Sequence, residues 1–232
     1  MIGALGDIHG DFAAARRVMR RHPDISHWLC VGDVAADDGR FEPLPAPLYW
    51  IKGNNENFDA IAAGDLPAGF HYIPNGTLVT VAGLRVAGLG GTFAPTWFET
   101  AASELPHPRK STAKATELAD KRRHFVREEV EACSRLRADV LLTHEAAKPF
   151  RPVAGNRGPD AGKAAVNDVL AAARPRLHLF GHHHRFSTQT VAGVPSVGLD
   201  LVSRSYLLID EASLEYHVRF TSTDDGNQAP LS

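Results

Sequence analysis

The chain has 232 residues, of which 44% are hydrophobic and 22% are charged, and its formal net charge at pH 7 is -2. These values are typical of a soluble globular domain with a full core, and a charge this small excludes a general attraction to nucleic acid or membrane surfaces. No run of about 18 apolar residues is present, so we expect no membrane partner. The first residues do not resemble a signal peptide, and the two cysteines are too few for a disulfide framework, so we expect a cytoplasmic protein.

The first half of the chain alternates short apolar runs with polar turns. The first strand is predicted at residues 1–5, and Asp11 is expected to cap a helix that extends to about His22. Further strands are predicted at residues 28–31 and 48–51, and a β-hairpin at residues 78–87.

The second half begins with an irregular segment and a charged helix predicted from about residue 117 to residue 137. A strand at residues 140–142, a long loop, a helix capped by Asp160, and a strand at residues 177–180 follow. The remaining predicted strands are antiparallel, at residues 186–191, 194–199, 206–209 and 214–220. We expect one domain over residues 1–221 and a polar, disordered tail over residues 222–232.

Five of the apolar strands each end in side chains that can bind a metal ion. In α/β sheets, ligands bind at the carboxyl ends of the strands, so these side chains are expected to meet at one edge. In chain order they are Asp7 and His9 in GDIHGD, Asp33 in GDV, Asn54 in GNNE, His144 in THE, and His182 and His184 in GHHH.

This set of oxygen and nitrogen donors without thiolate suits Mn²⁺, Fe, Zn²⁺ or Mg²⁺, and we favour Mn²⁺. Seven ligands exceed the needs of one ion, whereas two divalent ions bridged by a carboxylate would use them all. Two adjacent ions are a recurrent device for the cleavage of phosphate esters by a bridging hydroxide. Each motif alone has a structural explanation, but all five behind strand-like runs favour a metal centre.

The order GDIHGD, GDV, GNNE, THE and GHHH resembles the calcineurin-like metallophosphoesterases, over roughly residues 1–200. The resemblance implies an α/β fold, a four-layer α-β-β-α sandwich in which two mixed β-sheets pack face to face with helices outside. It places Asp7, His9 and His184 on one metal ion, places Asn54, His144 and His182 on the other, and makes Asp33 the bridge. Within the family, GLRVAGLGGTF and the segment KRRHFVREEVEACSRLRADVLLTHE look most like the RNA lariat debranching enzymes and their relatives.

Asn55 stands where this family usually has a histidine that protonates the leaving group or steadies the phosphate. Asparagine donates a hydrogen bond but no proton, and a positioned general acid contributes typically about 10²–10⁴-fold. The chain is therefore expected to cleave esters with good leaving groups, to use another acid, or to work slowly. Asn55 and His183 are the catalytic candidates, and Glu56 and His124 are further candidates for the acid.

Three side chains are candidates for substrate contacts. Trp97 could stack on a base or fix its loop to the core, and Arg151 and Arg157 could reach an ester oxygen or lie on the surface. A basic strip could contact a phosphate backbone or be a solvated helix face. Its members are Arg109, Lys110, Lys114, Lys121, Arg122, Arg123 and Arg127.

The favoured function is a binuclear metal-dependent phosphoesterase that acts on a phosphodiester or nucleotide, with nucleic acid as a potential partner. A phosphomonoesterase is the alternative within the enzymes. A non-catalytic binding module on the same fold is the alternative outside them, and Asn55 is the observation that favours it. The sequence leaves the oligomeric state open.

Overall fold

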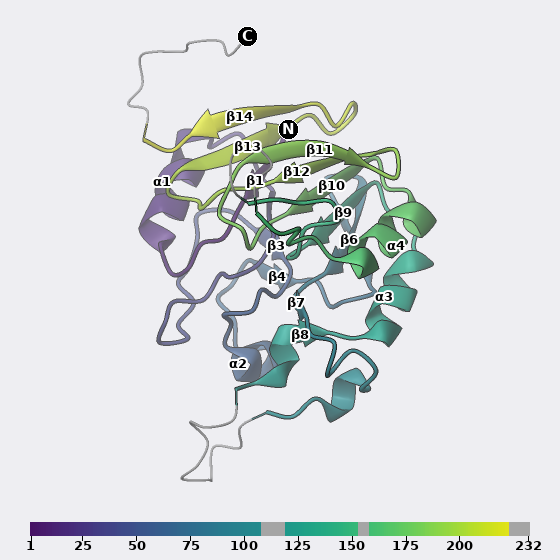
Figure 1. Cartoon of the computed structure of the whole chain (residues 1–232). Coiled ribbons are helices and arrows are strands. Elements are labelled where there is room, and N and C mark those ends of the chain that lie inside the picture. The colour runs from purple at the N-terminus through teal and green to yellow at the C-terminus, as the bar shows by residue number, and fades with distance from the viewer. Residues whose placement is uncertain (108–118, 153–157, 223–232) are drawn as a thin grey trace.

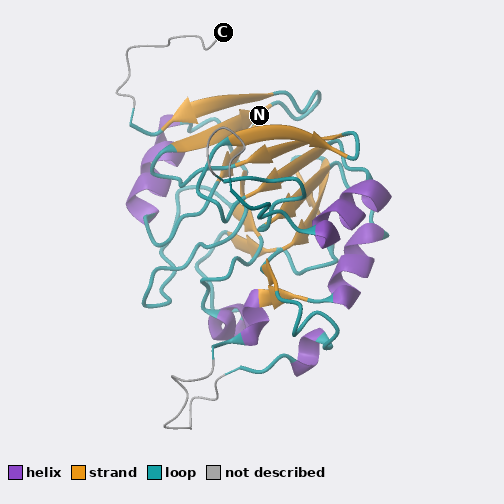
Figure 2. Cartoon of the chain, in the orientation of Figure 1, coloured by secondary structure: helices purple, strands orange, loops and turns teal. Residues whose placement is uncertain are grey.

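The computed structural model describes residues 1–107, 119–152 and 158–222, and within them two six-stranded β-sheets pack face to face. Helix α1 lies on the outer side of one sheet, α3 and α4 lie on the outer side of the other, and the short α2 lies at the lower end of the molecule in this view (Figures 1 and 2). The predicted α/β two-sheet sandwich is therefore confirmed. The predicted disorder of the tail concerns residues that are almost all outside the described part of the chain.

The first sheet has the order β14-β13-β1-β2-β3-β4. Strands β1 to β4 are parallel to one another, whereas β13 and β14 are antiparallel to their neighbours. Their bounds are β1 (Ile2–Leu5), β2 (Trp28–Cys30), β3 (Leu48–Trp50), β4 (Phe70–Tyr72), β13 (Ser205–Ile209) and β14 (Tyr216–Phe220).

The second sheet has the order β11-β12-β10-β9-β6-β5. Strands β12, β10, β9 and β6 are parallel, and the edge strands β11 and β5 are antiparallel to their neighbours. The bounds are β5 (Leu78–Val81), β6 (Leu84–Leu89), β9 (Val140–Thr143), β10 (Leu177–Phe180), β11 (Ser187–Val191) and β12 (Val194–Gly198). The predicted hairpin is the β5–β6 pair.

Helices α1 (Phe12–Arg21) and α2 (Phe58–Ala63) pack on the first sheet, and α3 (Arg127–Ser134) and α4 (Ala164–Ala173) on the second. Helix α1 begins as predicted, because the Asp11 carboxylate accepts the backbone N–H of Ala14 at 2.9 Å. No helix in the described part of the chain is long and apolar enough to cross a membrane.

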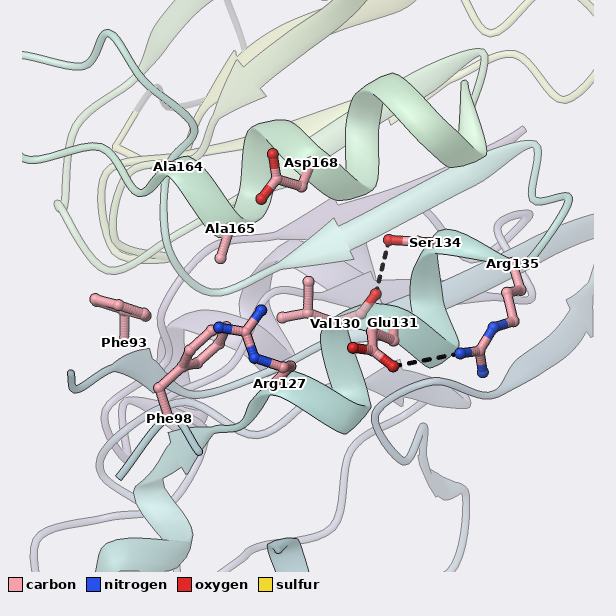
Figure 3. A pocket seen from close by; sticks show the side chains of 10 residues that line it. All are labelled: Phe93, Phe98, Arg127, Val130, Glu131, Ser134, Arg135, Ala164, Ala165 and Asp168. Carbon is pink, nitrogen blue, oxygen red and sulfur yellow. Dashed lines mark hydrogen bonds and ion pairs between the residues drawn. The ribbon is translucent and has the colours of Figure 1, made fainter. Parts of the chain in front are cut away.

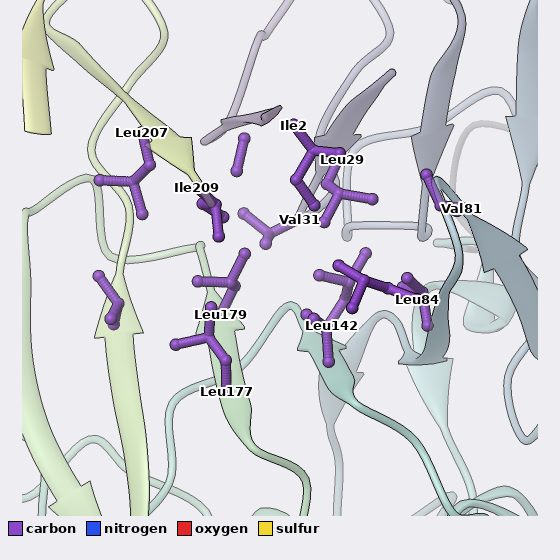
Figure 4. Close-up of a cluster of buried hydrophobic side chains, with 14 of the residues drawn as sticks. Ile2, Leu29, Val31, Val81, Leu84, Leu142, Leu177, Leu179, Leu207 and Ile209 are labelled. Atoms are coloured by element: carbon purple, nitrogen blue, oxygen red, sulfur yellow. The ribbon is translucent and has the colours of Figure 1, made fainter. Parts of the chain in front are cut away.

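The central core lies between the two sheets. Leu29 and Val31 from the first sheet meet Leu142 and Leu179 from the second (Figure 4). Because side chains alternate along a strand, Trp28 and Cys30 point the other way, toward α1. Burial on both faces explains why these strands are continuous apolar runs in the sequence.

The single charged helix predicted over residues 117–137 was wrong. Lys121–Arg123 form a 3-10 turn, β8 (His124–Phe125) pairs with β7 (Thr92–Phe93), and only α3 is α-helical. The Lys52 ammonium donates to the carbonyls of Arg122 and His124, at 2.9 and 3.1 Å, so tertiary bonds replace helical ones.

The predicted cap at Asp160 was also wrong. Its carboxylate accepts the backbone N–H groups of Phe150 and Gly162, each at 2.9 Å, and therefore closes the loop. Helix α4 begins only at Ala164. The sequence prediction also missed α2, β4 and β7, which are short and have little periodicity.

Candidate metal centre

The carboxyl ends of five parallel strands meet at one place. Strands β1, β2 and β3 are neighbours in the first sheet, and β9 and β10 are neighbours in the second. The seven predicted ligand residues follow these strands, and the structure brings their side chains together. The convergence that was expected from the sequence pattern is therefore present.

The backbone bends sharply at four of the seven residues. His9, Asp33, His182 and His184 have φ values of 46°, 50°, 67° and 47°. This left-handed region is uncommon for residues other than glycine and is concentrated at functional sites. All four residues lie in the turns that follow the strands.

The first group consists of Asp7, His9 and His184, whose ligand atoms lie within 4.8 Å of one another. His184 Nε2 lies 3.0 Å from Asp7 Oδ2 and 3.0 Å from His9 Nε2. Two imidazole nitrogens and a buried carboxylate oxygen therefore face a common point. A cation there would be a shared partner for all three.

The second group consists of Asp33, His144 and His182, again within 4.8 Å. Asn54 adds its amide oxygen, 3.1 Å from His144 Nε2. His144 Nδ1–H donates to the carbonyl of Val31 at 2.8 Å, and this bond fixes the tautomer that presents Nε2 to the group. This is the orienting bond that metal-binding histidines ordinarily make.

Asp33 lies between the two groups. Its Oδ2 is 3.5 Å from His9 Nε2 and 3.6 Å from His144 Nε2. Burial alone would raise the pKa of Asp33, but the hydrogen bond and charge of His144, with the N–H of Asn55, hold this pKa well below its usual value. Asp33 is therefore an ionised carboxylate shared by both groups.

The donor set fits two divalent cations. Asp7 and Asp33 are both 1% exposed, and buried carboxylates need compensating charge. Burial lowers the pKa of His182 to about 4, so this imidazole is neutral at pH 7, the form that binds metals. His144 differs: burial would lower its pKa, but Asp33 raises it to about 9. Metal binding at Nε2 requires the neutral imidazole, so a bound cation would take the place of that proton.

Glycines make the close approach of these motifs sterically feasible. A Cβ on Gly53 would lie 2.0 Å from Asp33 Oδ1, and one on Gly181 would lie 2.3 Å from Asp7 Oδ1. No side chain fits at either distance. The glycines of GNNE and GHHH are therefore part of the construction of the site.

Glu56 connects the turns that follow β2 and β3, a role that the sequence did not reveal. Its carboxylate accepts the N–H groups of Val34, Ala35 and Gly53 at 3.0–3.1 Å, which ties the GDV turn to the GNNE turn. Burial of this carboxyl group raises the pKa of Glu56 to about 8, against the opposing effect of those hydrogen bonds. The only sequence signal was an acid directly behind two asparagines.

Asn55 holds Asp33 with two bonds. Its backbone N–H donates to Asp33 Oδ1 at 2.7 Å, and its Nδ2 donates to Asp33 Oδ2 at 3.0 Å. The residue is exposed, so it also faces the solvent side of the centre.

His183 lies differently. Its ring packs on Phe150, with 4.5 Å between centroids, and on His182, with 5.0 Å. Burial lowers the pKa of His183 to about 3, so at pH 7 it holds no acidic proton to donate. His124, the other histidine considered, contacts Thr92 Oγ1 through Nδ1 at 3.1 Å.

The predicted substrate contacts are less closely tied to the centre. Lys121 Nζ lies 5.8 Å from the centroid of the Trp97 ring, and the Arg151 guanidinium donates to the carbonyl of Gly158 at 2.7 Å. Arg157 lies outside the described residues, as do Arg109, Lys110 and Lys114 of the basic strip.

Two hollows in the described part of the chain bear on where a substrate could bind. One of 310 Å³ is lined by Asn54 and Asn55 and adjoins the second ligand group. A larger one of 470 Å³ lies between α3 and α4 and includes Phe93 and Phe98 (Figure 3). Arg127 of the basic strip lines the larger hollow, but none of the candidate metal ligands does, whereas Asn54 lines the smaller one, which is therefore the candidate substrate site.

Comparison with known proteins agrees with this geometry. Residues 1–186 match the family described as calcineurin-like phosphoesterase. An uncharacterized protein from Haemophilus influenzae is 24% identical over 199 residues, which cover 79% of this chain and 83% of the relative.

Two solved structures share the fold. TT1561 of Thermus thermophilus has a TM-score of 0.62 and 14% identity, covering 95% of this chain and 98% of its own. A dimetal phosphatase from Danio rerio has a TM-score of 0.53 and 13% identity, with the same coverage of both chains. The family match covers most of the sequence and includes all seven candidate ligands. The chain therefore belongs to the calcineurin-like phosphoesterases, metal-dependent hydrolases that act on phosphate esters.

Proposed function

We propose that the chain hydrolyses phosphodiesters or nucleotides at a centre of two divalent metal ions. The observation that carries the proposal is the position of Asp33, whose Oδ2 lies between His9 Nε2 and His144 Nε2 at 3.5 and 3.6 Å. One carboxylate oxygen within reach of two ligand groups is the arrangement that a bridging ligand requires. The proposed ligands are Asp7, His9 and His184 for one ion, and Asn54, His144 and His182 for the other.

Mn²⁺ is the ion that we propose, because the donors are imidazole nitrogens and carboxylate and amide oxygens without thiolate. Two bound ions would supply Lewis-acid stabilisation of the phosphoryl oxygens and would activate a nucleophilic water. The protein's own part is to hold the donors. Val31 orients His144, Asn55 orients Asp33, and Glu56 joins the two turns that carry them.

The presence of asparagine at position 55 favours, as substrates, esters whose leaving groups need no proton. Asparagine at this position holds Asp33 and supplies no acid, and His183 is neutral at pH 7. Alkyl monoesters depend most on protonation of the leaving group, so they are the less favoured substrates. The two sequence segments that resemble the lariat debranching enzymes are a further reason to propose diesters of nucleotides. We also propose a single domain over residues 1–221 and a cytoplasmic location.

Comparison of two chromogenic esters tests the proposal. The protein would be loaded with Mn²⁺ and given bis-p-nitrophenyl phosphate or p-nitrophenyl phosphate, with the chelated protein and Asp33→Asn as controls. Nitrophenolate leaves without a proton, so the assay reports on the metal centre independently of Asn55. We expect faster turnover of the diester, lost in both controls. Equal turnover by Asp33→Asn would overturn the two-ion centre, and faster turnover of the monoester would overturn the preference for diesters.

A further inference from the structure

The hollow beside the second ligand group is built from segments that are far apart in the sequence. Asn54 and Asn55 follow β3, Asp37 lies in the loop after β2, Phe58 begins α2, and Arg123 belongs to the 3-10 turn before β8. Its volume of 310 Å³ is at the lower end of the range for small-molecule sites, about 300–1,000 Å³. A group bound there is therefore small, such as a sugar phosphate.

Arg123 differs from the two basic residues that precede it. Arg122 pairs with Asp120 and Asp59, and Lys121 lies against the Trp97 ring. Within the described ranges, by contrast, no hydrogen bond or ion pair is found for the side chain of Arg123, a half-buried residue. A guanidinium carries five N–H donors in a planar fork that matches phosphate. This side chain lines the hollow with those donors available.

The backbone on both sides of Arg123 is fixed by a buried lysine. Lys52 is 8% exposed, and its ammonium donates to the carbonyls of Arg122 and His124 at 2.9 and 3.1 Å. Burying an ammonium is costly unless it is well bonded. Lys52 also lies two residues before Asn54, so the same strand end carries a proposed ligand and holds the segment of Arg123. Lys52 therefore links the position of Asn54 to that of the segment that carries Arg123.

Among the described residues that line the hollow, Arg123 is the one basic residue, and the acidic residues are Asp37, Glu56 and Asp120. Asp120 binds the Arg122 side chain with both oxygens, and Glu56 accepts three backbone N–H groups. Asp37 is exposed at the rim. Arg123 is therefore the side chain of this hollow that could bind an anion.

We propose that Arg123 binds a second phosphate group of the substrate, in this hollow and beside the ester that is cleaved. The inference rests on the proposed function and narrows its substrate class to esters that carry a further phosphate group. A bidentate bond from the guanidinium to phosphate is charge-assisted, so its loss is expected to weaken binding by about 10- to 100-fold.

A matched pair of substrates separates this contact from the cleavage site. Thymidine 5′-(p-nitrophenyl phosphate) and its 3′-phosphorylated form release the same nitrophenolate and differ only in the second phosphate. We expect the wild type to show a lower KM for the phosphorylated form. Arg123→Gln should remove that advantage through KM, with little change for the other substrate, and Arg123→Lys should restore it in part. The control is Arg135→Gln, because Arg135 is an exposed arginine at the end of α3. This variant should leave the KM of both substrates unchanged.

Calorimetry provides a measurement that does not depend on turnover. Thymidine 3′,5′-bisphosphate should bind the Mn²⁺-loaded protein more tightly than thymidine 5′-monophosphate, and Arg123→Gln should abolish the difference. Asp37→Asn should tighten binding, because it removes a negative charge from the rim. If hydrolysis fails but these differences remain, the proposed function is wrong and the anion site stands. Equal effects of Arg123→Gln on both ligands, or no preference by the wild type, would overturn the second-phosphate site.

Discussion

At the scale of single residues, Asn55 has two separable roles in the site. Its backbone N–H and its side chain both hold Asp33, but only the side chain changes on substitution. Asn55→His would keep the backbone bond and add an imidazole at an exposed position beside the centre. Because a general acid contributes typically about 10²–10⁴-fold, turnover of alkyl esters should rise by at least about tenfold.

Steady-state kinetics on paired esters would measure this change. Nitrophenyl esters are the internal control, since nitrophenolate needs no proton and its release should stay near the wild-type rate. A rise for both classes would point to a change in the metal centre and not to protonation. An unchanged rate for alkyl esters would mean that another group already supplies the proton or that none is required.

The two histidines of GHHH that face the centre serve different groups. His182 belongs with Asp33 and His144, whereas His184 belongs with Asp7 and His9. His182→Ala and His184→Ala should each therefore lower the bound metal by about one ion per chain. Elemental analysis after gel filtration measures the content, with the exposed His217 on β14 substituted in the control His217→Ala. Loss of both ions in either variant would contradict separate groups.

Sequence reasoning was strongest for residues that end a strand. Each proposed ligand lies in the turn that follows an apolar run, so its neighbours along the chain reveal its place. Glu56 and Arg123 could not be recognised in this way. The N–H groups that Glu56 accepts include two that are 21 and 22 residues distant, and Arg123 is fixed by Lys52, 71 positions earlier. Their roles depend on tertiary contacts that no local pattern contains.

At the scale of elements, the strand ends determine how closely two turns can approach. Gly53 follows β3 where the Asp33 carboxylate packs, and a Cβ added to this glycine would lie 2.0 Å from Asp33 Oδ1. Gly53→Ala should displace the Asp33 carboxylate and lower the affinity for metal at least about tenfold, because the bridging carboxylate would no longer face both groups. A titration with Mn²⁺ measures this affinity. Gly64→Ala is the matched control, because that glycine has a φ of 70° at the end of α2 but nothing within 4 Å. Equal loss in both variants would indicate general destabilisation.

The element that sequence reasoning described least well is the segment before α3. Its charges and apolar spacing favoured one long helix. In the structure, the backbone of residues 122–125 instead accepts hydrogen bonds from Lys52 and pairs with β7. The hydrophobic periodicity of a sequence indicates which face of an element is apolar. It does not indicate whether other groups compete for the backbone carbonyls. The error coincides with a segment that lines the candidate substrate site, where local preference and tertiary demand conflict.

At the scale of the whole molecule, the candidate centre joins the two sheets. Asp7, Asp33 and Asn54 follow strands of the first sheet, and His144, His182 and His184 follow strands of the second. Each ligand group contains members from both sheets. A bound ion would therefore connect the two layers at their shared edge, in addition to the apolar core between them.

Metal binding should consequently stabilise the fold against heat. An ion present at 100 times its Kd stabilises the native state by about 2.7 kcal/mol, which corresponds to about 5–10 °C in Tm for a chain of this size. Circular dichroism with Mn²⁺ and with chelator would measure the shift. Asp33→Asn removes the carboxylate shared by both groups, so its Tm should respond much less to Mn²⁺, while His217→Ala should respond as the wild type does. An equal shift in Asp33→Asn would mean that Mn²⁺ binds elsewhere, and the link between the sheets would have to be abandoned.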